Sequence, residues 1–190
     1  MIFLAIGLLL FLGVHTVSIA APQWRDAAAA RIGEGSWKAG YSLIAGVGLG
    51  LVVLGYGLAR QQPVVLYEPP AGLRHLALLL MVPVFPLLLA AYLPGRVQRA
   101  ARHPMLVAVK LWATAHLLAN GTLADVLLFG SFLAWAVADR ISLRRRPARA
   151  TPGAPPSPAN DAIAIGAGLL LYVLFLWRGH AWLIGVSPLG

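Results

Sequence analysis

Six long apolar segments, separated by short polar or basic loops, constrain the fold of this chain more than any other feature. A helix that crosses a bilayer needs about 20 mostly apolar residues. Because 59% of the residues are hydrophobic and only 11% are charged, the chain lacks the polar surface of a water-soluble domain. We predict an all-α integral membrane protein, a bundle of about six transmembrane helices, with five as the alternative count. The expected spans are 2–20, 36–59, 73–93, 104–119, 122–138 and 161–177.

Residues 140–160 differ in composition from the rest of the chain. Arginine recurs from Arg140 to Arg149, and the run Thr151-Pro-Gly-Ala-Pro-Pro-Ser-Pro158 follows. Proline-rich stretches favour extended, poorly ordered linkers. The sequence therefore predicts a five-helix membrane core over 1–139, a basic cytoplasmic linker over 140–160, and a sixth helix with a short non-cytoplasmic tail over 161–190.

The basic residues are distributed unequally between alternate loops. Lys and Arg concentrate on the cytoplasmic side of membrane proteins. The opposite loops hold only Arg60, Arg74 and Arg178, so both termini are predicted to be non-cytoplasmic. Since the net charge of +9 is explained in this way, nucleic-acid binding is not expected. The Arg-, Ala- and Leu-rich composition suggests a GC-rich bacterial genome. The eleven basic residues of the cytoplasmic side are Arg25, Arg31, Lys38, Arg96, Arg99, Arg102, Arg140, Arg144, Arg145, Arg146 and Arg149.

Smaller residue patterns predict local structure within the spans. The second span is rich in glycine, including a GxxxG at 46–50, which favours close helix packing and would equally admit a flat ligand. Pro83 and Pro86 should kink the third span. Thr122 is expected to cap the fifth span, with Asp125 as its capping-box partner. The first span is expected to stay uncleaved, although residues 18–20 resemble a signal-peptide cleavage site.

Two histidines lie well inside apolar spans and are the strongest candidate functional residues. Ionisable side chains are costly in a membrane and are therefore functional candidates. Neutral His15 and His116, on different helices, suit axial ligation of a haem iron. A hydrogen-bonded core histidine is the alternative for each. The chain has no cysteine, so thiolate ligands are excluded, and no P-loop, dinucleotide fingerprint or Ser-His-Asp arrangement is present.

The remaining ionisable candidates lie nearer the ends of the spans. His103 begins the fourth span, where it can act as an interfacial cap or as a ligand. Thirteen residues separate it from His116 on one helix, so these two cannot ligate opposite faces of one haem. Lys110 can extend to the cytoplasmic surface, or neutralise an anion such as a haem propionate or a lipid headgroup. His75 and His180 are expected to be solvated near the outer interface.

The segment Arg102-His103-Pro104 through Lys110-Leu-Trp-Ala-Thr-Ala-His116-Leu-Leu-Ala-Asn-Gly121 resembles the signature of the NnrU family. Residues 7–15, Tyr41 and residues 127–136 are also similar to that family. The resemblance implies a link to denitrification, through nitrite and nitric oxide metabolism. The same family contains the plastid 15-cis-zeta-carotene isomerase, a membrane haem b enzyme.

In that isomerase branch two histidines are proposed as axial ligands, at positions that match His15 and His116, and the histidine of the HP motif matches His103. The branch has a cysteine where this sequence has Ala113, so no thiolate can act in ligand switching here. We expect a haem b-binding inner-membrane protein linked to nitric oxide metabolism, in which Lys110 and the cytoplasmic arginines contact the propionates. The expected partners are membrane lipid and nitric oxide or a lipophilic substrate.

Three alternative functions remain open at this point. One is a haem-dependent cis-trans isomerase that acts on a polyene dissolved in the bilayer. The second is a non-enzymatic accessory subunit of a nitrite or nitric oxide reductase, and the third is a small transporter.

Overall fold

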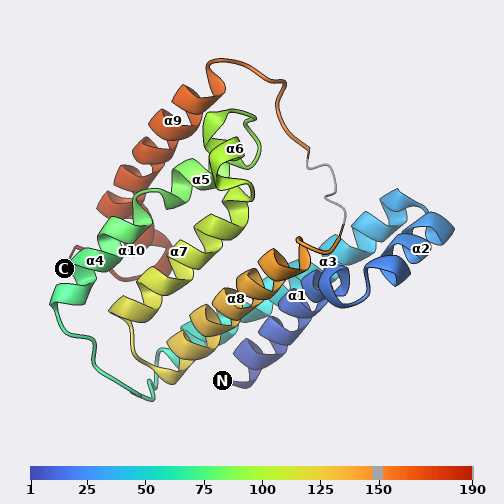
Figure 1. Cartoon of the computed structure of the whole chain (residues 1–190). Coiled ribbons are helices and arrows are strands. Elements are labelled where there is room, and N and C mark those ends of the chain that lie inside the picture. Colours follow the sequence, from blue (N-terminus) through green and yellow to red (C-terminus); the bar gives the residue numbers. More distant parts are fainter. Residues whose placement is uncertain (147–151, 190) are drawn as a thin grey trace. The chain divides into compact units, whose positions relative to one another are not determined.

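The computed structural model describes residues 1–146 and 152–189 (Figure 1). Over these residues the regular structure is helical apart from one isolated β-bridge, which confirms the predicted all-α class. The helices form two compact units that alternate along the chain. Unit 1 comprises Met1–Pro69 and Ala119–Ala148, and unit 2 comprises Pro70–Leu118 and Arg149–Gly190.

Unit 1 is built from three long helices and one short helix. They are α1 (Ile2–Ala20), α2 (Pro22–Ile32), α3 (Glu34–Ala59) and α8 (Leu123–Ser142). Figure 1 shows α1 beside α3, and α8 packs against both. The helix α2 occupies a stretch predicted to be a loop, and proline in its first turn is compatible with a helix start.

The helices α1 and α3 approach each other backbone to backbone through three glycines. A Cβ at Gly7 would lie 2.5 Å from a backbone nitrogen of α3, and one at Gly48 would lie 2.6 Å from a backbone nitrogen of α1. A Cβ at Gly55 would collide with the backbone at Leu4, which is itself fully buried. Glycine is therefore required at these positions because a side chain would separate the helices.

The glycines of the predicted GxxxG pair lie on a different face of α3. A Cβ at Gly46, Gly50 or Gly57 would meet no atom within 4 Å. The prediction that the glycine-rich span packs closely is thus confirmed. The contact with α1 uses Gly48 and Gly55, so the expectation that the GxxxG pair makes it was wrong.

The turn before α8 is held by the segment that follows α3. The N–H of Leu123 donates to the carbonyl of Val64 at 2.8 Å, and the Tyr67 hydroxyl donates to the carbonyl of Asn120 at 2.7 Å. A Cβ at Gly121 would collide with the Tyr67 carbonyl, so this turn requires glycine. Partial burial, with a smaller effect of the Asp125 charge, raises the pKa of Tyr67 and keeps its hydroxyl a donor.

Unit 2 contains the remaining helices. They are α4 (Gly72–Met81), α5 (Val84–Ala90), α6 (Arg96–Ala101), α7 (Pro104–Ala119), α9 (Asn160–Leu174), the π-helical turn η1 (Phe175–Gly179) and α10 (His180–Ile184). Its core contains Val84, Leu87 and Ala108, with Trp112 packed against them. The last helical segment runs seven residues beyond the predicted end at 177, so His180 lies within it and not after it.

The predicted kink of the third span is confirmed, since the chain breaks between α4 and α5 next to Pro83. The N–H of Val82, the first residue after α4, donates to the carbonyl of Leu79 at 3.2 Å. In a continuous α-helix it would donate to the carbonyl of Leu78 instead. The hydroxyl of Tyr172 on α9 donates to the carbonyl of Leu78 at 2.7 Å. A side chain from a neighbouring helix thus satisfies the carbonyl that the kink leaves open, as apolar surroundings require.

Within the described residues, four helical segments are long and apolar enough to cross a membrane: Ile2–Ala20, Glu34–Ala59, Gly72–Ala90 and Asn160–Ile184. The helix α7 is apolar but shorter. The helix α8 has 20 residues, and charged side chains near both of its ends shorten its apolar stretch. The architecture is consistent with a helical membrane protein, and the count of six spans stays a prediction.

The proline-rich segment has no regular secondary structure from 152 to 157, as predicted, but it is held in place. The N–H of Ala154 donates to the carbonyl of Tyr92 at 2.8 Å. The buried side chain of Asn160 donates from Nδ2 to the carbonyl of Pro94 at 2.9 Å. Arg149 and Thr151 of the predicted linker lie outside the described residues, and its first residues, from Arg140, continue α8.

Candidate functional site

His15 lies on α1 among aromatic side chains from all three long helices of unit 1. The ring centroids of Phe11 on α1, Tyr41 on α3 and Trp135 on α8 lie 4.4, 5.1 and 5.7 Å from the imidazole centroid. A second ring on α8, Phe132, lies 5.6 Å from Phe11. The prediction that His15 points into the helix bundle and not toward lipid is confirmed for unit 1.

One hydrogen bond fixes the orientation of the His15 imidazole. Its Nδ1 lies 2.6 Å from the carbonyl oxygen of Phe11, one turn earlier on α1. Because a carbonyl oxygen only accepts, Nδ1 carries the hydrogen, and the neutral ring has its lone pair on Nε2. Histidines that bind a metal through one ring nitrogen commonly donate from the other nitrogen to a backbone carbonyl.

His116 repeats this local geometry on α7 in unit 2. Its Nδ1 lies 2.8 Å from the carbonyl oxygen of Trp112, again four residues earlier, and the two rings lie 5.3 Å apart. The neutral imidazole therefore also has its lone pair on Nε2. His15 and His116 belong to different units, so their action as a pair stays a prediction.

Two buried donors occur on and just beyond α8, in the part of unit 1 that contains His15. In the described part of the chain, Trp135 Nε1 and Arg146 Nε have no hydrogen-bond partner. The Nη2 of Arg146 pairs with Asp139, which lies one helical turn after Trp135. A buried donor without an acceptor costs about 1–3 kcal/mol, so this part of unit 1 suits a group that carries acceptor oxygens.

A family model described as NnrU protein matches residues 3–188, which is nearly the whole chain. The chain belongs to the NnrU family. No curated protein and no solved structure matched it.

The histidine of the HP motif in this NnrU-family chain lies at the N-terminus of α7. The carbonyl of His103 accepts the N–H of Val107 at 3.1 Å, and its own N–H donates to the carbonyl of Ala101 at 2.7 Å. Arg102 has a φ of 60°, an unusual value for a residue with a side chain. Backbone geometry thus places His103 where a helix-capping residue stands, while a role as a ligand stays a prediction.

Lys110 lies half-buried on α7, about two turns after His103. No carboxylate lies within ion-pair distance of its ammonium group in the residues described. Both predicted roles, extension to the membrane surface and neutralisation of an anion, fit this environment. The described residues also contain no cluster of three His, Asp or Glu side chains that could hold a metal ion.

Asp125 of this NnrU-family chain is a structural carboxylate, as the Thr-x-x-Asp pattern predicts. The Thr122 N–H donates to Asp125 Oδ2 at 2.9 Å, and the Asp125 N–H donates to Thr122 Oγ1 at 3.3 Å, which completes a capping box. Nothing in the sequence indicated the third partner, the hydroxyl of Tyr56. Trp135 was also missed, although an indole within an apolar span carries an N–H that needs an acceptor.

Proposed function

We propose that this NnrU-family chain binds haem b in the membrane, with His15 and His116 as axial ligands of the iron. The observation that carries the proposal is the hydrogen bond that both imidazoles make. Each donates from Nδ1 to the carbonyl four residues earlier, which leaves the lone pair on Nε2. Haem iron needs only one or two side-chain ligands, so a cluster of several metal-binding residues is not required.

Two buried donors of unit 1, one on α8 beside His15 and one just beyond α8, support the same proposal. Haem b carries two propionate carboxylates, and Trp135 Nε1 and Arg146 Nε are donors that such oxygens would satisfy. Arg146 is one of the arginines expected to contact the propionates. Lys110 is the corresponding candidate in unit 2. The rings of Phe11 and Tyr41 hold the imidazole in place and limit the access of water to it.

The proposed role is redox or nitric oxide-linked chemistry in denitrifying metabolism, in line with the family resemblance. Bound haem would supply a redox-active iron and a coordination position for nitric oxide. The chain's own contribution is to place an imidazole of fixed tautomer and to keep its surroundings apolar. If haem is bound, His15 and His116 would hold its iron, and the hydrogen bond at Nδ1 of each ring would keep the imidazole in the required orientation.

The proposed location is the inner membrane of a bacterium, with both termini outside the cytoplasm. Four segments qualify as spans by length and composition. If α7 and α8 also cross the membrane, the number of spans rises from four to six. Because both numbers are even, the two termini lie on the same side, and the arginine distribution assigns that side as non-cytoplasmic.

Absorbance spectra of the purified full-length protein test the proposal, recorded oxidised and dithionite-reduced. We expect a b-type spectrum that is lost in His15→Ala and in His116→Ala. His75→Ala is the matched control, because this histidine on α4 is exposed and is not among those that donate from Nδ1 to the carbonyl four residues earlier. A wild type that stays colourless after haem is supplied would refute haem binding, and stable co-purification with a reductase would then favour the accessory-subunit function.

An isomerase of a membrane polyene is the second candidate function. The observation that favours it is the face of α3 formed by Gly46, Gly50 and Gly57, where a Cβ would meet no atom within 4 Å and a flat chain could lie. Ala113, which is fully buried, stands where the isomerase branch has cysteine. Because the chain contains no cysteine, a thiolate-dependent mechanism is not available. Product analysis in cells that accumulate a cis-carotene separates this candidate from the first.

A further inference from the structure

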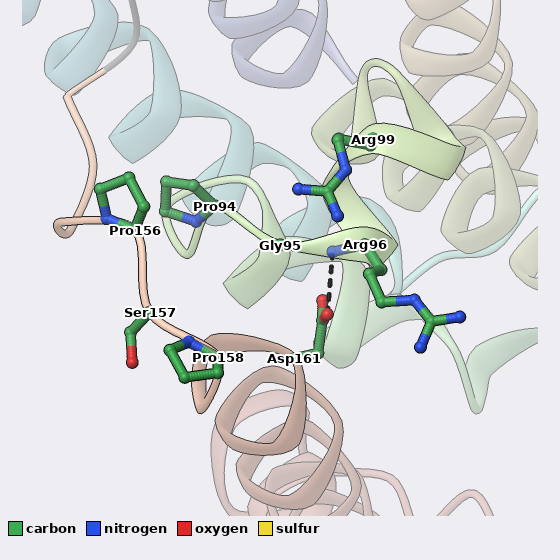
Figure 2. Close-up of a pocket in the computed structure, with 8 residues that line it drawn as sticks. All are labelled: Pro94, Gly95, Arg96, Arg99, Pro156, Ser157, Pro158 and Asp161. Atoms are coloured by element: carbon green, nitrogen blue, oxygen red, sulfur yellow. Dashed lines mark hydrogen bonds between the residues drawn. The ribbon is translucent and has the colours of Figure 1, made fainter.

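A pocket of about 430 Å³ lies within unit 2, where α6 begins beside the start of α9 (Figure 2). Its lining includes the side chains of Arg96 and Arg99 on α6, Ser157 in the proline-rich segment, and Asp161 on α9. The apolar segment Gly72–Ala90 ends shortly before it, and the apolar segment Asn160–Ile184 begins beside it. If these segments span a bilayer, the pocket therefore lies at the boundary between lipid and water.

The carboxylate of Asp161 is committed to the protein backbone. Its Oδ2 accepts the N–H of Arg96 at 2.8 Å, and its Oδ1 accepts the N–H of Val97 at 3.0 Å. A Cβ at Gly95 would collide with this carboxylate, so the backbone at this position is shaped for it. The negative charge of Asp161 thus binds the first turn of α6 to the first turn of α9.

The two arginine side chains that line the pocket are not committed in this way. Arg96 and Arg99 are exposed and lie three residues apart, hence on neighbouring positions of α6. In the described part of the chain, neither guanidinium group lies within ion-pair distance of a carboxylate. In Figure 2 their guanidinium groups flank the bond between Asp161 and the α6 backbone. Two positive charges against one negative charge make the pocket electropositive.

We propose that this pocket binds the phosphate of an anionic phospholipid headgroup through the guanidinium groups of Arg96 and Arg99. Basic pockets between helices at the membrane boundary suit such headgroups, and guanidinium groups match the geometry of phosphate oxygens. The hydroxyl of Ser157 is a further donor at the pocket wall. Next to the pocket, α9 exposes Ile165 and Leu169, one and two turns after Asp161, which provide an apolar surface for the acyl chains. This surface favours a lipid over a free phosphate ion.

Native mass spectrometry of the full-length protein tests the proposal, with phosphatidylglycerol and phosphatidylcholine added separately. We expect preferential binding of phosphatidylglycerol, and a loss of about tenfold or more in its affinity in the double variant Arg96→Gln/Arg99→Gln. Arg102→Gln is the matched control, because it removes one arginine from the same region without changing the pocket lining. Arg96→Lys/Arg99→Lys should retain part of the affinity.

Three results would overturn the proposal. Equal binding of the two lipids would do so, as would equal losses in the double variant and in Arg102→Gln. Displacement of phosphatidylglycerol by inorganic phosphate at comparable concentration would assign the pocket to free anions. Should the double variant unfold, Arg99→Gln alone serves, because Arg99 lines the pocket but its backbone N–H, unlike that of Arg96, does not bond to Asp161. All measurements use the full-length protein as purified, with its haem content recorded for each variant, so their outcome is separate from that of the haem proposal.

Discussion

The hydroxyl of Tyr56 on α3 donates a 2.5 Å hydrogen bond to the carboxylate of Asp125 on α8. Asp125 is only 4% exposed, and the N–H and hydroxyl of Thr122 also donate to it, at 2.9 and 2.6 Å. A buried carboxylate is tolerated only when donors surround it. The cap of one helix is therefore also the polar contact that joins it to another helix.

Tyr56→Phe should destabilise the protein, because it removes one donor from a buried carboxylate without changing the packing volume. We expect a loss of about 1–3 kcal/mol in the free energy of unfolding, measured by thermal or denaturant unfolding in detergent. Tyr92→Phe is the matched control, since its half-exposed hydroxyl makes no hydrogen bond in the described structure. An equal effect of both variants would contradict the assigned role of Tyr56.

Alanine at Gly55 should weaken the packing of α1 on α3, whereas alanine at Gly57 should not. A Cβ at Gly55 collides with backbone atoms of α1, and one at Gly57 meets open space. Overpacking of this kind costs about 1–3 kcal/mol. Gly57→Ala should be neutral or stabilising by about 0.5–1 kcal/mol, because glycine disfavours helix. Melting temperatures of the two variants check this, and a larger loss for Gly57→Ala would refute the assigned contact.

Trp135→Phe should affect the haem-free and the haem-loaded protein differently. In the haem-free protein it removes a buried donor without an acceptor, so stability should stay unchanged or rise by up to about 3 kcal/mol. If Nε1 contacts a propionate, the loaded variant should lose haem faster, as transfer to an acceptor protein measures. Trp182→Phe, at an exposed position on α10, is the control. Unchanged haem loss in Trp135→Phe would remove this residue from the proposed site.

Cysteine labelling can determine the orientation of the chain, because the sequence contains no native cysteine. A membrane-impermeant maleimide should label Ser187→Cys in intact spheroplasts and label Ala100→Cys only after lysis. The physical reason is the excess of arginine on the side that contains α6. Both positions are exposed, so failure to label reports on the membrane and not on burial. The reverse pattern would place both termini in the cytoplasm.

Local signals in the sequence were enough for much of the fold. The span 2–20 coincides with α1, and the span 104–119 coincides with α7, because apolar length and the flanking prolines define both. The Thr122–Asp125 capping box and the break at Pro83 followed from chemistry within a few residues. In each case the structural cause lies inside the segment that it shapes.

The remaining features depend on partners that are distant in the chain. Gly46 belongs to the GxxxG pair and Gly48 does not, but only Gly48 faces α1, and the sequence of α3 alone does not identify that face. The α2 helix was missed because the search for spans passed over a short polar stretch rich in alanine. For the candidate site, the position of His15 in the bundle was predicted, whereas its contact with Trp135 was not, since α1 and α8 meet only in the folded chain.

Because the two units alternate along the chain, the helices of unit 1 are not synthesised one after another. The ribosome delivers α1 and α3 first and α8 only after α4–α7 have been made. Until then Tyr56 lacks its carboxylate and His15 lacks the indole of Trp135. The close glycine contact between α1 and α3 can form at this early stage, and it would hold the nascent helix pair together in the bilayer. A glycine variant would then act on the yield of inserted protein, before any cofactor could bind.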